Sequence, residues 1–190
     1  MARVPPVDPE RRFPFQGPLT AFATSRAGRW FGINVSARVD PLLMRLTRGR
    51  VSTFFGAPVV LITTTGRRSG QRRTVPVLYF TEGDDVVVIA SSFGRARHPA
   101  WYHNLRASGK ATLTARGRTG TYVADEVVDP DERLRLYRRG ERLYSGWREY
   151  EAMAGAAGRQ IAVFRLRPGD ERHPARHSAT RSRAASPHSG

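Results

Sequence analysis

Residues 58–80 read PVVLITTTGRRSGQRRTVPVLYF, and the pattern in this run sets the fold class. Residues 59–65 are a β-branched apolar run, which is typical of a buried strand. The polar, glycine-bounded residues 66–71 predict a turn, and residues 73–80 predict a second strand in which Pro76 marks an edge or a bulge. The run therefore predicts a β-hairpin whose turn carries arginines.

Similar short strands continue along the chain. After a hairpin turn at residues 82–85, further strands are expected at residues 86–91, 111–116, 119–124 and 160–166. Short helices are expected at residues 19–30, 40–49, 98–105, 129–142 and 144–153. Because short turns rather than crossover helices join consecutive strands, we expect an α+β chain built around an antiparallel barrel of about six strands.

The length and composition suit one cysteine-free domain. The chain has 190 residues, enough for a single core. We expect this domain at residues 19–168, between an irregular N-terminal arm at 1–18 and a disordered basic tail at 169–190. The absence of cysteine excludes disulfides, thiolate chemistry and iron–sulfur clusters. No stretch predicts a membrane span or a secretory signal, so the expected location is the cytoplasm.

The chain is strongly basic. Lys and Arg number 32 against 16 Asp and Glu, which gives a net charge of +16. Almost all of the positive charge is arginine, which reflects either a coding bias or an anionic partner, because arginine binds carboxylates and phosphates bidentately. Nucleic acid is one such partner, but the chain lacks RNP-like aromatic strands and a helix-turn-helix pattern.

The stretch at residues 63–73, which contains the turn, is the densest candidate site. Its glycines allow backbone amides to point at an anion, and its arginines can close on that anion with charge-assisted bonds. A solvated hairpin tip with surface arginines explains the same residues about equally well. The spacing is not that of a P-loop, and no GxGxxG motif follows a strand, so a dinucleotide site of the Rossmann type is not expected.

Two further groups of residues could line a flat ligand. The small hydroxyl residues Ser91 and Ser92 end a strand and precede Trp101 on a predicted helix. Tyr144, Trp147 and Tyr150 are spaced by three residues, which places them along one side of a helix or turn. For Trp101 and for these three aromatic residues, packing in the core is the simpler explanation from residue type alone.

The run at 58–80, followed by VVVIASSFGRARHPAWYHNLRASG at 86–109, resembles the deazaflavin-dependent nitroreductase family. This is the actinobacterial group of F420-dependent quinone and nitro-compound reductases, and the similarity covers roughly residues 45–167. The TTTGRRSGQ and HPAWYHNL stretches at this separation make a specific pair. The resemblance implies a split β-barrel with short flanking helices and the coenzyme F420, a deazaflavin with a polyanionic phospholactyl and polyglutamate tail.

The resemblance also implies roles for individual residues. The residues expected to bind the tail phosphate and carboxylates belong to the basic turn: Arg67, Arg68, Ser69 and Arg73. Those expected around the deazaflavin are Ser91, Ser92 and Trp101. Those expected to wall the acceptor pocket, as the catalytic residues, are Tyr144, Trp147 and Tyr150. The implied reaction is hydride transfer from reduced F420 to a planar acceptor, with quinones expected first, then activated alkenes or nitro compounds, and with no metal.

Other interpretations stay open at this point. An FMN-binding oxidoreductase of the same barrel class could place its phosphate on the same turn, and a basic barrel could bind nucleic acid without sequence preference. The segment with Phe22, Trp30 and Phe31 could make peripheral contact with the inner face of the cell membrane. Related barrels often dimerise, so a homodimer is a further expectation.

Overall fold

The computed structural model describes residues 3–11, 17–18, 21–22, 25–31, 39, 46–47 and 57–169. The helix expected at 19–30 overlaps α2, which is Arg26–Phe31. Most of the helix expected at 40–49 lies outside the described residues. The tail expected at 169–190 also lies outside them, apart from its first residue.

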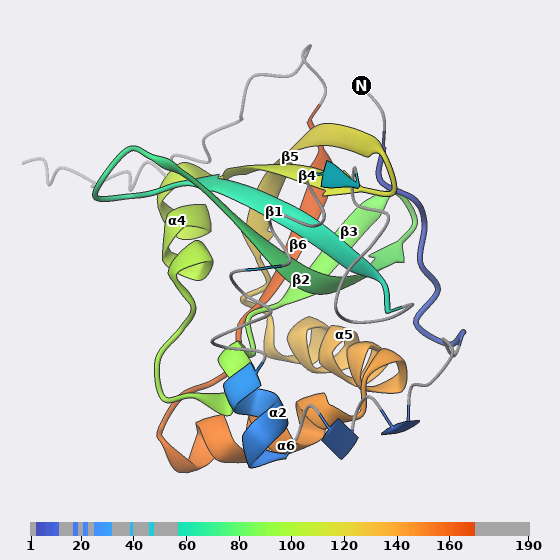
Figure 1. The fold of residues 1–190 in the computed structure, drawn as a ribbon, viewed down its shortest axis with the longest axis vertical. Coiled ribbons are helices and arrows are strands. Elements are labelled where there is room, and N and C mark those ends of the chain that lie inside the picture. The colour runs from blue at the N-terminus through green and yellow to red at the C-terminus, as the bar shows by residue number, and fades with distance from the viewer. Residues whose placement is uncertain are drawn as a thin grey trace, which may run out of the picture.

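Six strands of the described part close into a barrel in the order β1-β2-β3-β6-β5-β4, and every neighbouring pair is antiparallel (Figure 1). They are β1 (Val59–Thr65), β2 (Arg72–Glu82), β3 (Asp85–Ile89), β4 (Lys110–Ala115), β5 (Arg118–Glu126) and β6 (Val163–Pro168). This confirms the expected antiparallel barrel, and β1 has the expected bounds.

The hairpins were predictable because their strands are joined locally. The pairs β1–β2, β2–β3 and β4–β5 all match the expectation. Pro76 lies in the part of β2 that pairs with β1, and the β2–β3 ladder begins only at Tyr79. The Tyr79 amide donates to the Pro58 carbonyl on the β1 side, so by alternation along the strand the Pro76 nitrogen faces the opposite side, where no ladder is recorded at that point, as suits a residue without an N–H. The insertion of β6 between β3 and β5 and the closure of β1 on β4 are long-range pairings.

Three longer helices accompany the barrel within the described ranges. They are α4 (Ala100–Ser108), α5 (Pro130–Leu143) and α6 (Gly146–Ala156). Asp129 caps α5, because its Oδ1 accepts a 2.7 Å hydrogen bond from the Glu132 amide, and Pro130 occupies the first turn. Helices α5 and α6 lie together on one side of the barrel (Figure 1).

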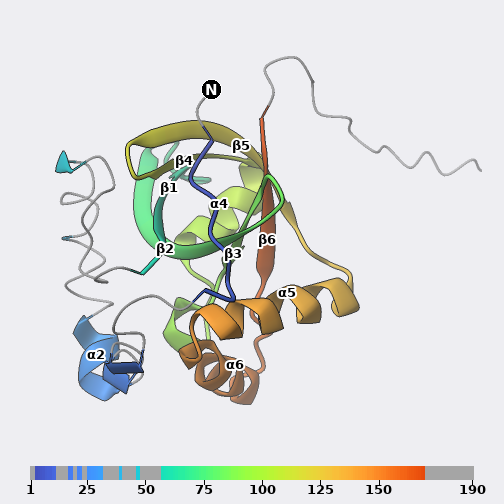
Figure 2. The same ribbon diagram turned by 90° about the vertical axis from the view of Figure 1, so that its right-hand side faces the viewer.

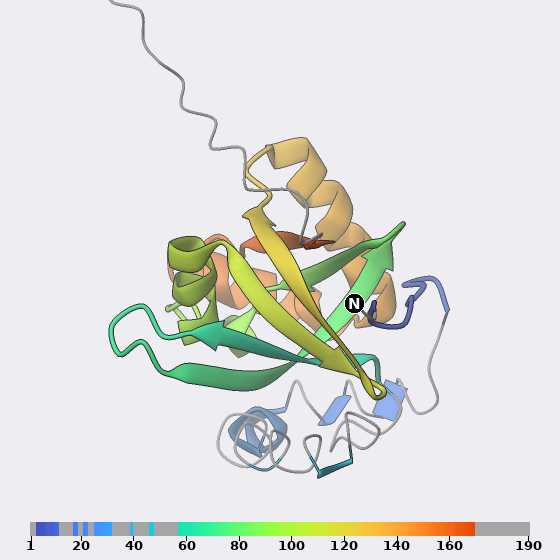
Figure 3. The same cartoon turned by 90° about the horizontal axis from the view of Figure 1, so that it is seen from above.

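The core has two main parts. One fills the barrel and includes residues of α4, among them Trp101 and Leu105. The other lies between the barrel wall and helices α5 and α6, and includes Phe80 and Tyr137. Figure 2 views the barrel nearly end-on, and Figures 2 and 3 place α4 at one end and the N-terminal segment at the other.

The N-terminal segment is tied to the barrel although residues 3–8 form neither helix nor strand. The Val4 amide donates to the Tyr122 hydroxyl at 3.0 Å, and the Tyr79 hydroxyl donates to the Pro5 carbonyl at 3.0 Å. Burial raises the pKa of Tyr79 to about 12, so its hydroxyl stays a donor at neutral pH. These bonds hold the segment against one end of the barrel.

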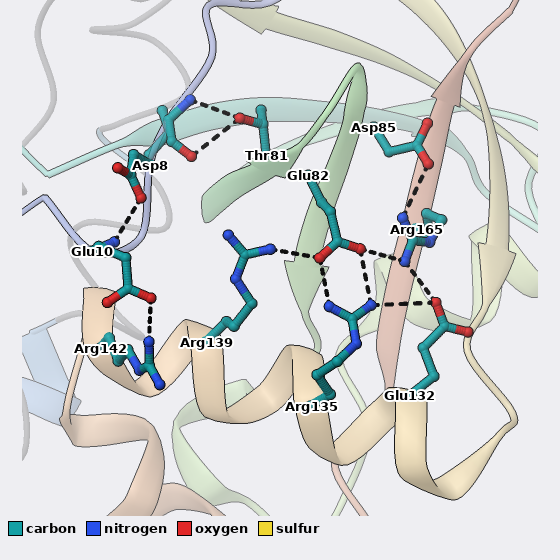
Figure 4. Close-up of polar contacts among 11 residues, drawn as sticks. Asp8, Glu10, Thr81, Glu82, Asp85, Glu132, Arg135, Arg139, Arg142 and Arg165 are labelled. Atoms are coloured by element: carbon teal, nitrogen blue, oxygen red, sulfur yellow. Dashed lines mark hydrogen bonds and ion pairs between the residues drawn. The ribbon is translucent and has the colours of Figure 1, made fainter.

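Carboxylates and arginines join α5 to the barrel wall (Figure 4). The Glu82 carboxylate accepts from Arg135 at 2.6 Å, Arg139 at 2.5 Å and Arg165 at 2.7 Å. Arg165 also reaches Asp85 at 3.1 Å and Glu132 at 2.6 Å. We call these six residues the Glu82 cluster. Hydrogen bonds, first from Arg135, hold the pKa of Glu82 down at about 2 against the opposing effect of its partial burial.

Candidate functional site

The basic turn after β1, together with the first two residues of β2, makes up residues 66–73, which are largely exposed but internally bonded. The Gly66 amide donates to the Gln71 carbonyl at 2.8 Å, and the Gly70 amide donates to the Gly66 carbonyl at 2.8 Å. Gly70 has a φ of +66°, a left-handed conformation that glycine adopts without a steric cost. We call this segment the arginine turn; its Arg67, Arg68 and Arg73 side chains are exposed.

Asn104 of α4 fastens the arginine turn to the barrel. Its Nδ2 donates to Thr64 Oγ1 at 3.0 Å, and its Oδ1 accepts from the Arg67 amide at 3.1 Å. Asn104 is buried, and both ends of its amide are bonded. Sequence reasoning missed this role, although an Asn in the middle of an apolar helix face is the kind of buried polar residue that needs partners.

The arginines of the turn have no carboxylate partner among the described residues. Ion pairs in the described part involve arginines elsewhere, and none involves Arg67, Arg68, Arg72 or Arg73. Arg73 donates to the neutral Gln71 side chain at 2.9 Å, and Ser69 Oγ accepts from the Gln71 amide at 3.4 Å. The turn therefore presents uncompensated positive charge on an anchored backbone.

The loop after β3 has a strained backbone. Ser92, Phe93 and Gly94 have φ values of +52°, +55° and +73°, and Ser92–Gly94 is assigned as a short 3-10 element, η2. A non-glycine residue in this region costs on the order of 1 kcal/mol or more, so surrounding contacts must hold it. A Cβ on Gly94 would lie 2.9 Å from Met153 Cβ, which shows how closely α6 packs here. We call residues 91–95 the left-handed loop.

The buried side chain of Arg159 holds the backbone of the left-handed loop by hydrogen bonds. Its guanidinium donates to the carbonyls of Arg95 at 2.7 Å, Ala90 at 3.1 Å and Ser91 at 2.7 Å. The residue is 7% exposed, and burial lowers its pKa, with a smaller opposing effect from Tyr137. Sequence reasoning did not identify Arg159. The only local signal in the sequence is Gly158, which lies just past the end of α6 and has a φ of +72° in the structure.

The aromatic triad of Tyr144, Trp147 and Tyr150 is buried in the core beneath this loop, with exposed fractions of 5%, 3% and 2%. The Tyr144 and Tyr150 hydroxyls lie 3.1 Å apart and share a hydrogen bond, and burial raises the pKa of Tyr144. Phe93 packs edge-on against Tyr150 with ring centroids 5.9 Å apart. The structure thus brings the triad and the left-handed loop together through Phe93.

Trp101 lies inside the barrel core. It is 8% exposed and packs against Phe164 with centroids 6.0 Å apart. The core packing considered for this residue is therefore present, and its expected contact with the deazaflavin stays a prediction. In Figure 1 the chain from η2 runs to α4, which lies beside the β1–β2 hairpin, so one segment connects the left-handed loop to the anchor of the arginine turn.

The described part of the chain shows neither a cluster of metal ligands nor a helix that could cross a membrane. No three His, Asp or Glu side chains there gather closely enough to hold a metal ion. None of the described helices combines the length and apolar character that crossing a bilayer requires.

Comparison with known proteins identifies relatives over most of the barrel. The sequence model of the F420H(2)-dependent quinone reductase family matches residues 36–168. An F420H(2)-dependent quinone reductase of Mycobacterium tuberculosis is 38% identical over 110 residues, which cover 54% of this chain and 74% of that protein.

Solved structures agree with this match. An F420-H2 dependent reductase, FDR-A, superposes with a TM-score of 0.51 at 28% identity, covering 57% of this chain and 93% of that one. A structure described as a domain-swapped dimer superposes with a TM-score of 0.53 at 26% identity, covering 67% of this chain and 96% of that one. Because the family model spans well over half of the sequence, the chain belongs to the F420H(2)-dependent quinone reductase family.

Proposed function

We propose that this protein binds reduced F420 and passes its hydride to a quinone. The observation that carries the proposal is the arginine turn, whose cations have no carboxylate partner among the described residues and whose backbone is anchored by Asn104. An uncompensated group of arginines is a ready binding site for an anion.

The residues of the turn fit the tail of F420, which carries a phosphate and glutamyl carboxylates. Arg67, Arg68 and Arg73 are exposed and can form bidentate bonds with those groups, while Ser69 can add a hydroxyl donor. At the left-handed loop, Ser91 and Ser92 are partly exposed and can donate hydrogen bonds to a polar ring edge. Reduced F420, when bound, supplies the hydride; the protein supplies binding, orientation and charge.

The aromatic triad is proposed to serve the acceptor. Because burial raises the pKa of Tyr144, its hydroxyl keeps its proton at neutral pH and can donate to a quinone oxygen, while the Tyr150 hydroxyl 3.1 Å away shares a hydrogen bond with it. Trp147 packs edge-on against Tyr144 with centroids 5.8 Å apart and limits how far that ring can turn. A planar acceptor reaching the triad would have to pass Phe93, which suggests that Phe93 contributes to acceptor selection.

Parallel titrations test the cofactor. Purified protein is titrated with oxidised F420 and, separately, with FMN, and fluorescence is followed at moderate salt. We expect tight F420 binding and weak FMN binding, together with oxidation of reduced F420 when a soluble naphthoquinone is added. Tight FMN binding alone would instead support the FMN-binding alternative. Binding of random duplex DNA with a steep salt dependence, and no F420 binding, would point to a nucleic-acid partner.

Two further partners were expected, a second copy of the chain and the membrane surface, and we propose only the first. A homodimer is consistent with the relative described as a domain-swapped dimer, and sedimentation of the full chain tests it. Phe22 and Trp30 are exposed, but neither the family match nor the solved relatives support peripheral membrane contact. We therefore keep a cytoplasmic location as a prediction and assign no membrane role.

A further inference from the structure

Arg159 is a buried cation whose guanidinium donates its hydrogen bonds to the left-handed loop and to Ala90 just before it. Its Nε, Nη1 and Nη2 each donate to a backbone carbonyl, those of Arg95, Ala90 and Ser91. Within the described residues no carboxylate lies within 4.0 Å of it to make an ion pair. A planar fork with several donors can span carbonyls on both sides of a loop, which a single ammonium group cannot do.

Arg159 is itself held in place by the end of α6. Its amide donates to the Ala154 carbonyl at 2.9 Å, and the Gly158 amide donates to the Gly155 carbonyl at 2.9 Å. With Gly158 left-handed, these two bonds form a Schellman cap, which fixes the direction in which the chain leaves the helix. The cap therefore aims the Arg159 side chain at the left-handed loop.

The loop needs such a support because its local geometry is unfavourable. Ser92 and Phe93 are both left-handed without being glycine, and such residues persist only where the surroundings over-determine them. Arg159 bonds the carbonyls on the two sides of this strained pair, at Ala90 and Ser91 before it and at Arg95 after it. Local backbone bonds from Gly94 to Ser91 and from Arg95 to Ser92 hold the pair between these points.

We infer that Arg159 is a positioning residue for the cofactor site: it fixes the left-handed loop so that the Ser91 and Ser92 side chains are pre-set to meet the bound deazaflavin. The inference rests on the proposed function, since those serines are proposed cofactor contacts. Arg159 itself is not proposed to touch the cofactor. It lowers the entropy that the loop would otherwise lose when the cofactor binds.

The test compares three single variants of the full chain. Arg159→Met removes the charge and the donors at similar volume, and Arg159→Lys keeps the charge but loses the fork. Arg133→Met is the matched control, because Arg133 has a 12% exposed side chain and donates to the Ile161 carbonyl at 3.0 Å and to Glu151 at 3.4 Å, whereas none of its hydrogen bonds in the described structure goes to the loop. Melting temperature, the Kd for oxidised F420 and hydrogen exchange of residues 91–95 are measured for each.

We expect both Arg159 variants to weaken F420 binding by about tenfold or more, the effect of roughly one lost hydrogen bond. Exchange at the Gly94 and Arg95 amides should quicken in the same variants. Arg133→Met should lower the melting temperature while leaving Kd and loop exchange as in the wild type. A purely structural role predicts instead that all three variants lose stability alike and bind F420 alike.

The outcomes separate this inference from the proposed function. If the wild type binds F420 and Arg159→Met has the same Kd or the same loop exchange as the wild type, the positioning role alone is overturned. Failure of the wild-type protein to bind F420 overturns the proposed function and the positioning role together. Should Arg159→Met fail to fold, Arg159→Lys decides by the same two measurements.

Discussion

The arginine turn and the Glu82 cluster use the same residue type for opposite roles. In the cluster, Arg135, Arg139 and Arg165 all contact one carboxylate, and Figure 4 shows them converging on Glu82 from α5 and β6. In the turn, no described carboxylate forms an ion pair with the arginines. The comparison shows that the net charge of +16 does not say which arginines are paired with carboxylates and which are free to bind a ligand. Neutralised arginines hold the fold together, and only the uncompensated ones are available to an anionic ligand.

The largest expected effect is the loss of cofactor binding from the turn. Replacing both Arg67 and Arg68 with Ala should raise the Kd for F420 by about 100-fold, because charge-assisted bonds contribute about 1.5–3 kcal/mol each and solvent exposure reduces that sum. The melting temperature should stay close to that of the wild type. Fluorescence titration measures the affinity, with Arg118→Ala, an exposed arginine of the β4–β5 hairpin, as the control. Unchanged F420 affinity in the double variant would remove the turn from the cofactor site.

The reverse result is expected for the Glu82 cluster. Glu82→Gln leaves three arginines without their shared charge partner and should lower the free energy of unfolding by about 1–3 kcal/mol. The Kd for F420 should not change, because the cluster does not include residues of the proposed site. Urea unfolding measures the expected loss of stability, and F420 titration of the same preparation measures whether the affinity is unchanged. A weakened affinity without a loss of stability would mean that the two regions are coupled.

Acid should weaken the Glu82 cluster, because Glu82 is its central carboxylate. The pKa of Glu82 falls from an ordinary 4.5 to about 2 in the folded protein. A carboxylate with a depressed pKa stabilises the fold fully above its unfolded pKa, and this stabilisation is lost as the pH falls toward the folded pKa. The stability difference between the wild type and Glu82→Gln should therefore be greatest above about pH 5 and shrink between about pH 4.5 and 2. Urea unfolding at several pH values measures it, and a constant difference would contradict the assignment.

The smallest effect is expected where an arginine is paired but exposed. Arg167 contacts Asp125 at 2.6 Å, yet the two side chains are 59% and 54% exposed. Arg167→Ala should change the free energy of unfolding by less than about 0.5 kcal/mol and leave F420 binding unchanged, because exposed ion pairs contribute little. Thermal unfolding of this variant beside Glu82→Gln would show whether burial, rather than pairing alone, separates structural arginines from surface ones.

Much of the fold could be predicted because it is encoded locally. The β-branched run at residues 59–65, the glycine-bounded turn after it and the Asp129-Pro130 helix start each depend on neighbours a few residues away. The position of β6 could not be predicted in the same way. Its pairing with β3 and β5 joins segments far apart in the chain, and its apolar pattern suits several positions in a sheet.

The candidate site also has a part that the sequence indicated and a part that only the structure revealed. The resemblance pointed to the arginine turn, the two serines and the aromatic triad, and their ligand contacts stay predictions. The supports of that site, Asn104 and Arg159, were missed because each contacts residues distant in sequence: Arg67 lies 37 positions from Asn104, and Ser91 lies 68 positions from Arg159. An amide or guanidinium side chain carries no sign of which distant backbone groups it will bond.

The sequence alone determined the antiparallel strands, the basic hairpin turn and the membership of an F420-dependent family, because periodicity, turn chemistry and paired motifs are written in neighbouring residues. Tertiary structure alone decided which arginines would be neutralised. Glu82 and Arg135 are separated by 53 positions and meet only because α5 packs against the wall formed by β2, β3 and β6. The number of arginines follows from composition, but whether each is paired depends on its distance from a carboxylate, and the fold of the barrel and α5 sets that distance.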